Sequence, residues 1–257
     1  MTALTTPSSG GETTPASGGL TILVLAKAPV AGRSKTRLAP RYGDRGAALL
    51  AAAALSDTLG IVRRTPCARR VLVLDGQLAT DRQPAADGRP AADGPLVERA
   101  VMHLRTDGFD VVPQAAGDHA ERIRAAFETA DGPALLIGMD TPQVRVDTLR
   151  LDLDCPVDAW LGLAEDGGWW ALGLRHARRD AARVLAGVPM STDRTGAVQR
   201  TRLAEAGLRV AHLPMLRDVD EPDDAVAVAA LAPATRFAAC LRSLESELAG
   251  AGRPGVA

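Results

Sequence analysis

Four positively charged side chains lie within eleven residues, directly after the first apolar run of the sequence. They are Lys27, Arg33, Lys35 and Arg37, in a loop of small residues that includes Gly32. Such a loop lets backbone N–H groups approach an anion closely, and lysine and arginine direct positive charge toward phosphate oxygens. The loop is neither a Walker A motif nor a G-x-G-x-x-G fingerprint. It predicts binding of a nucleotide diphosphate or triphosphate, and the alternative is a solvated basic loop.

The two lysines in this loop are the only lysines of the chain, although Lys and Arg together number 30. The composition is rich in Ala, Gly and Arg, which indicates a genome that favours arginine codons. In such a genome arginine replaces lysine at every position where either residue can function. The survival of Lys27 and Lys35 therefore indicates that a compact, flexible ammonium group is needed at these positions.

Three carboxylates are candidates for binding a divalent cation. Asp140 follows the apolar run at 134–139, and Asp218 and Asp220 lie two positions apart further along the chain. Side chains at i and i+2 of an extended segment project to the same side, and Mg²⁺ or Mn²⁺ takes oxygen ligands, often from one or two carboxylates. The three carboxylates therefore predict a metal site beside the phosphates of the nucleotide. The alternative is structural, with a turn before Pro142 and a helix N-cap at Asp220.

Asp166 precedes two glycines, Gly167 and Gly168, in a turn between two apolar runs. The glycines allow an unusual backbone path that presents Asp166 in a cleft, where its carboxylate hydrogen-bonds an acceptor hydroxyl or acts as a base. The alternative is an ordinary hairpin turn. Trp169 and Trp170 follow, and we expect one of them to line a pocket while the other faces the core.

Apolar runs alternate with helical segments along most of the sequence. The pattern predicts a mainly parallel sheet with helices on both faces, an α/β fold in which ligands bind beyond the carboxyl ends of the strands. All the candidate residues above lie in loops at those ends. The expected strands are 20–26, 70–74, 109–113, 134–139, 157–163, 169–174 and 208–213, and the expected helices are 44–64, 96–105, 118–130, 178–185 and 195–206, before one or two closing helices.

One domain at 20–232 accounts for this alternation. Residues 1–19 are Thr, Ser, Gly, Pro and Ala in the main, and we expect a disordered leader. Residues 76–95 contain the near-duplicate PAADGRPAADGP and are expected to form an exposed insertion. Residues 233–257 are expected to form a C-terminal helix and a flexible tail.

The composition excludes several classes of function. The 257 residues carry a net charge of -1, which argues against nucleic acid and acidic membranes as partners. Three cysteines with no metal-binding spacing signal neither a disulfide framework nor zinc, and no apolar run approaches the length of a membrane span. We expect a cytoplasmic protein. The four histidines, which are His103, His119, His176 and His212, are expected to be structural or surface groups.

The motifs K-x-P-x-x-G-R-x-K-T-R-L, G-x-D-x-P, E-D-G-G and D-V-D-x-P-x-D occur in this order between residues 20 and 230. Together they resemble the bacterial GT-A-like glycosyltransferase family, whose members have largely unassigned substrates. That family is similar to the nucleotidylyltransferases that make molybdopterin guanine dinucleotide or guanylylate phospholactate. The resemblance implies a Rossmann-like, three-layer α/β/α nucleotide-diphospho-sugar transferase fold with a mostly parallel, mixed sheet.

The resemblance also implies roles for individual residues. It places Lys27, Gly32, Arg33, Lys35 and Arg37 on the nucleotide phosphates, with Lys35 and Asp166 as catalytic residues. It implies that Asp140, Asp218 and Asp220 bind the metal and that Asp166, Gly167, Gly168 and Thr192 bind the acceptor. Ser191-Thr192 resembles a family Ser-Thr element that usually follows a tryptophan, here Met190. Gln114, Gly117, Asp118 and Arg122 resemble a further element, in which His119-Ala120 replaces the more usual Leu-Gly.

One departure from the family bears on the reaction. Gly138 stands two positions before Asp140, where a metal-dependent glycosyltransferase of this fold usually has a first aspartate; a lone aspartate is more typical of nucleotidylyltransferases. Our leading hypothesis is glycosyl transfer from a nucleotide sugar to a small acceptor with Mg²⁺ or Mn²⁺. The alternatives are nucleotidyl transfer from a nucleoside triphosphate, with release of pyrophosphate, and a degenerate module that only binds a nucleotide.

Overall fold

The computed structural model describes residues 19–78 and 104–251. They form a seven-stranded sheet with the order β3-β2-β1-β4-β6-β5-β7. The strands are β1 Thr21–Lys27, β2 Arg69–Asp75, β3 Asp110–Pro113, β4 Ala134–Ile137, β5 Ala159–Ala164, β6 Trp169–Leu174 and β7 Val210–Leu216.

Only β6 runs against the direction of the other strands. β1 is parallel to β2 and β4, β2 is parallel to β3, β6 is antiparallel to β4 and β5, and β5 is parallel to β7. The carboxyl ends of six strands therefore meet at one edge of the sheet, together with the start of β6. This edge is the place where the fold brings together loops that lie far apart in the sequence.

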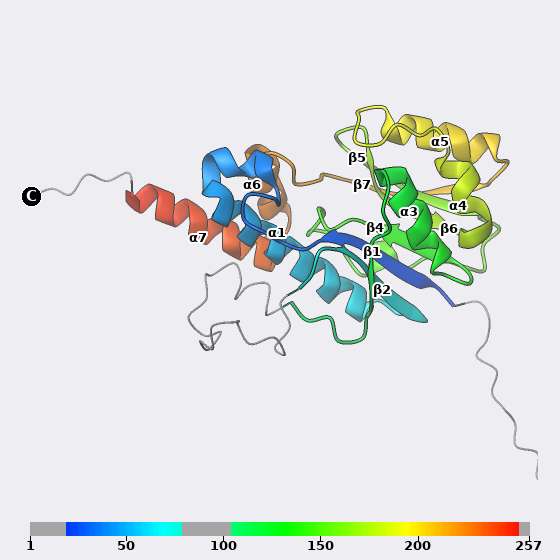
Figure 1. Cartoon of the computed structure of the whole chain (residues 1–257), viewed down its shortest axis with the longest axis horizontal. Helices are drawn as coiled ribbons and strands as arrows, with labels where there is room; N and C mark the ends of the chain where they lie inside the picture. The colour runs from blue at the N-terminus through cyan, green and yellow to red at the C-terminus, as the bar shows by residue number, and fades with distance from the viewer. Residues whose placement is uncertain (1–18, 79–103, 252–257) are drawn as a thin grey trace, which may run out of the picture.

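Helices cover both faces of the sheet (Figure 1). On one face, α1 Ala39–Arg64 packs on the apolar side chains of β1, β2 and β4. On the other face lie α3 His119–Glu128, α4 Ala177–Leu185 and α5 Thr195–Glu205. Because both faces are covered, the central strands are apolar at nearly every position, as in β4, where all four residues are buried. The predicted α/β fold with a mostly parallel, mixed sheet is confirmed.

The first half of α1 belongs to a second cluster beyond the sheet. It packs against α6 Pro222–Leu231 and α7 Arg236–Ala251 through buried residues that include Leu50, Val228 and Phe237 (Figure 1). Gly43 interrupts the helix with a φ of 68°, a left-handed conformation that glycine adopts readily. One continuous element thus connects the sheet to the C-terminal helices.

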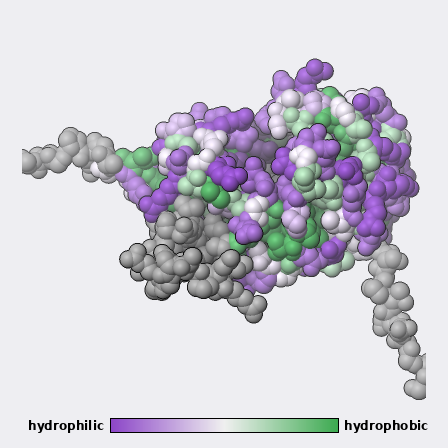
Figure 2. Space-filling model, in the orientation of Figure 1, coloured by the Kyte–Doolittle hydropathy of each residue, from purple (hydrophilic) through white to green (hydrophobic). Residues whose placement is uncertain are grey.

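Residues 36–64, which include α1, are long and apolar enough to cross a membrane by length and composition alone. However, 61% of the most apolar 18-residue window is buried inside the protein. The buried residues of α1 belong to the two clusters just described, so its apolar character is accounted for by core packing. On the face shown in Figure 2, hydrophilic residues cover most of the surface over α3, α4 and α5.

The predicted strands and helices lie within a few residues of the observed ones, with two differences. The first helix begins at Ala39 rather than Asp44, because Pro40 occupies its first turn and the chain continues through the irregular residue Gly43. The last strand extends to Leu216 rather than 213, through Pro214, which an edge strand tolerates. Most of the expected leader at 1–19, of the insertion at 76–95 and of the helix at 96–105 lies outside the described residues.

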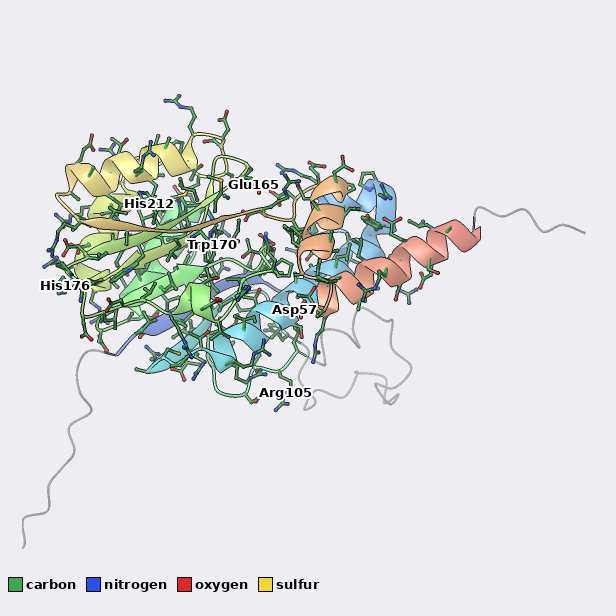
Figure 3. All side chains as sticks on the ribbon, turned by 180° about the vertical axis from the view of Figure 1, so that it is seen from behind. Asp57, Arg105, Glu165, Trp170, His176 and His212 are labelled. Atoms are coloured by element: carbon green, nitrogen blue, oxygen red, sulfur yellow. The ribbon has the colours of Figure 1, made fainter. Side chains whose placement is uncertain are left out.

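Asp57 connects α1 to the start of α7, as Figure 3 shows. Its two carboxylate oxygens accept hydrogen bonds from the backbone N–H groups of Arg236 and Phe237, at 3.1 and 2.8 Å. We expect Asp57→Ala to lower the free energy of unfolding by about 1–2 kcal/mol, because it leaves N–H groups at the helix start without their acceptor. Urea unfolding measures this change. Asp154→Ala, at an exposed position, is the control; equal losses in the two variants would contradict the capping role.

Candidate active site

Two adjoining cavities open at the carboxyl edge of the sheet, of about 360 and about 400 Å³. Both are lined by Leu25, Arg37, His119, Asp140 and Asp220, which form the border between them. We call the first cavity the basic pocket, because Lys27, Arg33, Lys35 and Arg122 also line it. We call the second the acidic pocket, because its further lining includes Asp166, Asp193 and Asp218 with Thr141, Ser191 and Thr192.

The loop at residues 28–38 is held in place by its own hydrogen bonds. The Ser34 hydroxyl accepts from the N–H of Val30 at 2.9 Å and lies 3.3 Å from the carbonyl oxygen of Ala28, to which it donates. The N–H groups of Arg33 and Ser34 both donate to the Val30 carbonyl. Gly32 adopts a φ of 74° within this turn. The predicted basic loop is thus an ordered turn along the basic pocket.

Lys35 is the most constrained residue of this loop. Its ammonium lies 2.7 Å from Oδ1 of Asp140 and 3.1 Å from Oδ1 of Asp220, and it also donates to the carbonyl of Val219. Its side chain is only 11% exposed. Burial works to lower the pKa of Lys35, but the carboxylates of Asp140 and Asp220 outweigh it and hold this pKa above its ordinary value. The lysine is therefore charged, with all three protons directed at oxygens.

The backbone of Lys35 is also unusual, with a φ of 48° and a ψ of 47°. A non-glycine residue in this left-handed region carries strain that the surroundings must offset. The ion pairs of the ammonium group provide that compensation. The conformation aims the side chain inward, toward the ends of β4 and β7.

Lys27 and the arginines of the loop remain open to the basic pocket. The Lys27 side chain is 57% exposed, and its ammonium lies 3.7 Å from the carboxylate of Asp75. Arg33 is exposed, and Arg37 lies 3.4 Å from Oδ2 of Asp220 with a side chain that is 66% exposed. The structure thus separates the two lysines, since Lys35 is committed to carboxylates and Lys27 faces solvent.

Asp140, Asp218 and Asp220 come together where β4 and β7 end. The N–H of Val219 donates to the Asp140 carbonyl at 2.9 Å, which fixes the Asp218–Asp220 segment beside the end of β4. Asp220 is occupied by Lys35 and Arg37. Asp218 is different, because its Oδ1 is buried and has no hydrogen-bond partner among the described residues.

Burial, together with the nearby carboxylates of Asp140 and Asp166, raises the pKa of Asp218 to about 7. An unpartnered oxygen with like charges around it suits a cation. Within the described residues no three side chains of His, Cys, Asp or Glu form a complete metal cage. Asp140 and Asp218 nevertheless suit a hard divalent cation held by two carboxylates and completed by substrate oxygens.

Asp166 is held in a tight turn against the start of α5. Its Oδ1 accepts from the N–H of Gly168 at 2.8 Å. Gly167 has a φ of 90°, and a Cβ there would lie 2.1 Å from the Asp193 carbonyl oxygen. The N–H of Gly196 donates to the Gly167 carbonyl at 2.8 Å. Gly167 is therefore required by close backbone contact with Asp193, and this contact holds the turn with Asp166 at the acidic pocket.

The loop before α5 adds hydroxyl groups to the same pocket. The Thr195 hydroxyl donates to the Pro189 carbonyl at 2.6 Å and accepts from the N–H of Thr192 at 3.1 Å. Ser191 adopts a φ of 59°. This loop therefore brings Ser191 and Thr192 to the acidic pocket. They are distant from Asp166 in the sequence but line the same pocket.

The adjacent tryptophans point to opposite faces of the sheet. Trp170 is 3% exposed in the core beneath α1, and its Nε1 donates to the Pro214 carbonyl at 3.0 Å. Trp169 packs on the opposite cluster and lines the acidic pocket. Figure 3 shows Trp170 near Glu165, beside the turn that holds Asp166. Glu165 itself forms an ion pair with Arg217 at 2.6 Å.

The pockets also include residues that were not among the predicted site residues, notably His119 and Asp193. His119 was expected to be a structural or surface group, yet it lines both pockets at the start of α3. Burial lowers its pKa, and Arg122 lowers it further, so its imidazole is neutral near pH 7. His176 and His212 line neither pocket, and His103 lies outside the described residues. The place of His119 beside the capping residue Asp118, at the carboxyl edge, was the available signal.

Residues 58–192 match the family described as "Uncharacterized protein conserved in bacteria (DUF2064)". No curated protein matches the sequence. Among solved structures, a candidate nucleotide-diphospho-sugar transferase from Desulfovibrio desulfuricans G20 has a TM-score of 0.69 at 22% identity, over 90% of this chain and 97% of that one. The 4-diphosphocytidyl-2C-methyl-D-erythritol synthase from Anaerococcus prevotii DSM 20548 has a TM-score of 0.50 at 9% identity, over 83% and 96%. These similarities confirm the predicted nucleotide-diphospho-sugar transferase fold.

The raised pKa of Asp218 predicts a pH-dependent effect of Asp218→Asn on stability. An aspartate with a folded-state pKa of about 7 destabilises the native protein as pH rises from about 4 to about 7, with full effect above pH 7. We expect the metal-free variant to be more stable than the wild type at pH 8, by at most about 4 kcal/mol, and to lose this advantage near pH 4. Urea unfolding across this range tests it, with Asp154→Asn as control. A constant difference at all pH values would exclude the buried charge as its cause.

Proposed function

We propose that this chain, which belongs to the DUF2064 family, is a divalent-cation-dependent transferase that moves a glycosyl group from a nucleotide sugar to a small uncharged acceptor. The observation that carries the proposal is the pair of adjoining pockets of opposite charge, with Asp140 on their border. A nucleotide sugar has an anionic half and an uncharged half, so a molecule lying across the border meets a suitable surface on each side.

The basic pocket suits the nucleotide half of the donor. Lys27, Arg33 and Arg37 offer exposed positive charge toward a diphosphate, beside the apolar floor of Leu25 and Met139. Charge-assisted hydrogen bonds from such groups to phosphate oxygens are among the strong interactions of recognition sites. As the sugar leaves the diphosphate, negative charge grows on the phosphate oxygens, and these side chains stabilise it.

Asp140 and Asp218 are the residues that would hold Mg²⁺ or Mn²⁺. The bound cation supplies positive charge to the diphosphate leaving group. Lys35 keeps Asp140 and Asp220 in place through the ammonium contacts at 2.7 and 3.1 Å. Its role in this proposal is to position the metal-binding carboxylate as well as to add charge.

The acidic pocket favours an acceptor without negative charge. Five aspartates line it, at positions 140, 166, 193, 218 and 220, and Arg37 is the one cationic side chain that lines it among the described residues. Lys35, Arg37 and a divalent cation together would offset four of these five charges, and the negative charge that remains disfavours a phosphate or carboxylate acceptor. Hydroxyl groups of a polyol instead find carboxylate acceptors and the hydroxyls of Ser191 and Thr192.

Asp166 is the residue we assign to the acceptor hydroxyl. Its Oδ1 is held by the N–H of Gly168, and Oδ2 remains available to accept a proton. In the proposed reaction the acceptor oxygen bonds to the anomeric carbon while the bond from that carbon to the phosphate oxygen breaks. The hydroxyl proton passes to Asp166, and the nucleoside diphosphate leaves with the bonding electrons.

Nucleotidyl transfer is the second candidate, favoured by one observation. Gly138 precedes Asp140 in place of a first aspartate, so the end of β4 presents a single carboxylate. In that reaction an acceptor attacks the α-phosphorus of a nucleoside triphosphate and pyrophosphate leaves. The charge of the acidic pocket makes the usual anionic acceptors of such enzymes a poor match, which is why glycosyl transfer is our first choice.

The products distinguish these reactions. The purified protein would be incubated with Mg²⁺ or Mn²⁺, a panel of nucleotide sugars or nucleoside triphosphates, and mixtures of neutral polyols or sugar phosphates. We expect a nucleoside diphosphate and a glycosylated polyol. Pyrophosphate with a nucleotidylated acceptor would favour the second reaction, and tight nucleotide binding with no product would indicate a binding module.

Asp140→Asn tests the metal site. The amide keeps the shape of the side chain but removes the charge that a hard cation requires. We expect Mg²⁺-dependent nucleotide affinity, measured by calorimetry, to fall at least about tenfold, with little change in metal-free affinity. Asp193→Asn, also in the acidic pocket, is the comparison. Unchanged affinity in the Asp140 variant would remove this residue from the site.

The two lysines form a matched pair of tests. Lys35→Arg puts a planar guanidinium where a compact ammonium meets three oxygens, so we expect turnover or nucleotide affinity to fall more than about threefold. Lys27→Arg changes an exposed group, so we expect its turnover and nucleotide affinity to stay within about twofold of the wild-type values. Wild-type behaviour of the Lys35 variant would show that its charge alone matters.

A further inference from the structure

Gln114 follows β3 and reaches across the ends of two neighbouring strands. Its N–H donates to the Leu74 carbonyl at 2.9 Å, which continues the pairing of β3 with β2. Its side-chain Nε2 donates to the Ala26 carbonyl at 2.8 Å and to the Val73 carbonyl at 3.3 Å. The side chain therefore lies over the carboxyl ends of β2 and β1, where it lines the basic pocket.

These two contacts determine which way the amide faces. Carbonyl oxygens only accept hydrogen bonds, so the group that meets them must be the NH₂ and not the oxygen. Both Nε2 protons are consumed, and Oε1 is left as the group available to a ligand. Among the described residues no donor reaches Oε1, and it does not belong to the buried, unpartnered oxygens of the protein.

The loop that follows Gln114 is rigid as well. Asp118 and Glu121 exchange side-chain-to-backbone hydrogen bonds at 2.8 Å across the start of α3. Gly117 has a φ of 114°, and a Cβ there would lie 2.2 Å from Glu121 Oε2. The β3–α3 connection thus presents Gln114 from a backbone that has little freedom to rearrange.

We infer that Gln114 selects the base of the nucleotide through a fixed hydrogen-bond acceptor, and that the site takes an amino-bearing base and discriminates against uracil. This inference rests on the proposed function, because it concerns the donor in the basic pocket. Leu25, Ala26 and Ala51 give that pocket an apolar wall suited to a base. On that wall Gln114 is a specificity residue, and it takes no part in the bond-breaking step.

The chemistry of the base edges gives the order of preference. Cytosine and adenine each present an exocyclic NH₂ donor, and guanine presents an NH₂ beside a ring N–H. Uracil has a single N–H between two carbonyl oxygens. A hydrogen bond from that N–H to Oε1 brings both carbonyl oxygens toward Oε1, and their repulsion makes the pairing weaker than the pairing with an exocyclic NH₂. Because Nε2 is held by two backbone carbonyls, the amide cannot turn to offer its donor to uracil instead. Because hydrogen-bond strength at a fixed acceptor differs between these bases, the affinity for an amino-bearing base exceeds the affinity for uracil.

Calorimetry with GDP, CDP, ADP and UDP in the presence of Mg²⁺ tests the inference on the wild-type protein. We expect at least one amino-bearing diphosphate to bind about tenfold more tightly than UDP, and Gln114→Met to reduce this ratio to within about threefold. UDP binding as tightly as the other three in the wild type would overturn the inference and leave the proposed function standing. Binding of none of the four would overturn both.

Gln199→Met is the matched control. Its Nε2 donates to the Val184 carbonyl at 2.9 Å, in a fully buried position that lines neither pocket. Both variants lose an amide-to-carbonyl contact, so both should melt at a lower temperature, but only Gln114→Met should change the ratio of affinities. An unchanged ratio in Gln114→Met, or an equal change in both variants, would mean that Gln114 is structural only. If Gln114→Met does not fold, the wild-type ranking of the four nucleotides decides.

Discussion

The ammonium of Lys35 joins three parts of the chain that lie far apart in the sequence. It extends from the loop after β1 to Asp140 after β4 and to the Val219–Asp220 segment after β7. Without a cation at this point, Asp140, Asp218 and Asp220 would repel one another at the edge of the sheet, and burial would add to the cost. The convergence of the loops therefore depends on one buried positive charge. The left-handed backbone of Lys35 is the local strain that accompanies this arrangement.

The ion pairs of Lys35 with Asp140 and Asp220 also lie between the two pockets. On one side of the Lys35 network the exposed cations of the β1 loop and Arg122 face the basic pocket. On the other side the carboxylates and hydroxyls of the β5–β6 turn and the α5 loop face the acidic pocket. The backbone hydrogen bond from Val219 to Asp140 keeps this border fixed. Opposite charges held so close allow one substrate to be bound along its length by different chemistry at each end.

Much of this arrangement could be predicted from the sequence. Parallel strands buried on both faces are nearly continuous apolar runs, so their positions and the loops after them were recognisable. Since those loops meet at one edge, the convergence of the loops followed from the topology. The ion pairs of Lys35 with Asp140 and Asp220 did not, because the family resemblance implies that Lys35 contacts the nucleotide phosphates. Burial was not predictable, because no neighbour in the sequence marks Lys35 as buried and Lys27 as exposed. The left-handed backbone at Lys35 directs its side chain inward, whereas Lys27, at the end of β1, stays exposed. His119 was missed because a lone histidine after a capping aspartate has no distinctive spacing.

The acidic and basic pockets also differ in how many substitutions their walls tolerate. On the acidic side, Gly167 lies so close to Asp193 that no side chain fits, and the positions of Asp166 and Thr192 depend on this backbone contact. On the basic side, the groups that face the ligand are side chains on an ordered turn, and one of them, Gln114, is tied to two strand carbonyls. A substitution at Gly167 would therefore disturb a whole wall of the acidic pocket. A substitution at Arg33 would alter one contact and leave the turn intact, because the hydrogen bonds of that turn come from its backbone and from Ser34. The geometry of acceptor binding is thus set by the backbone, whereas the choice of nucleotide is open to change through single side chains.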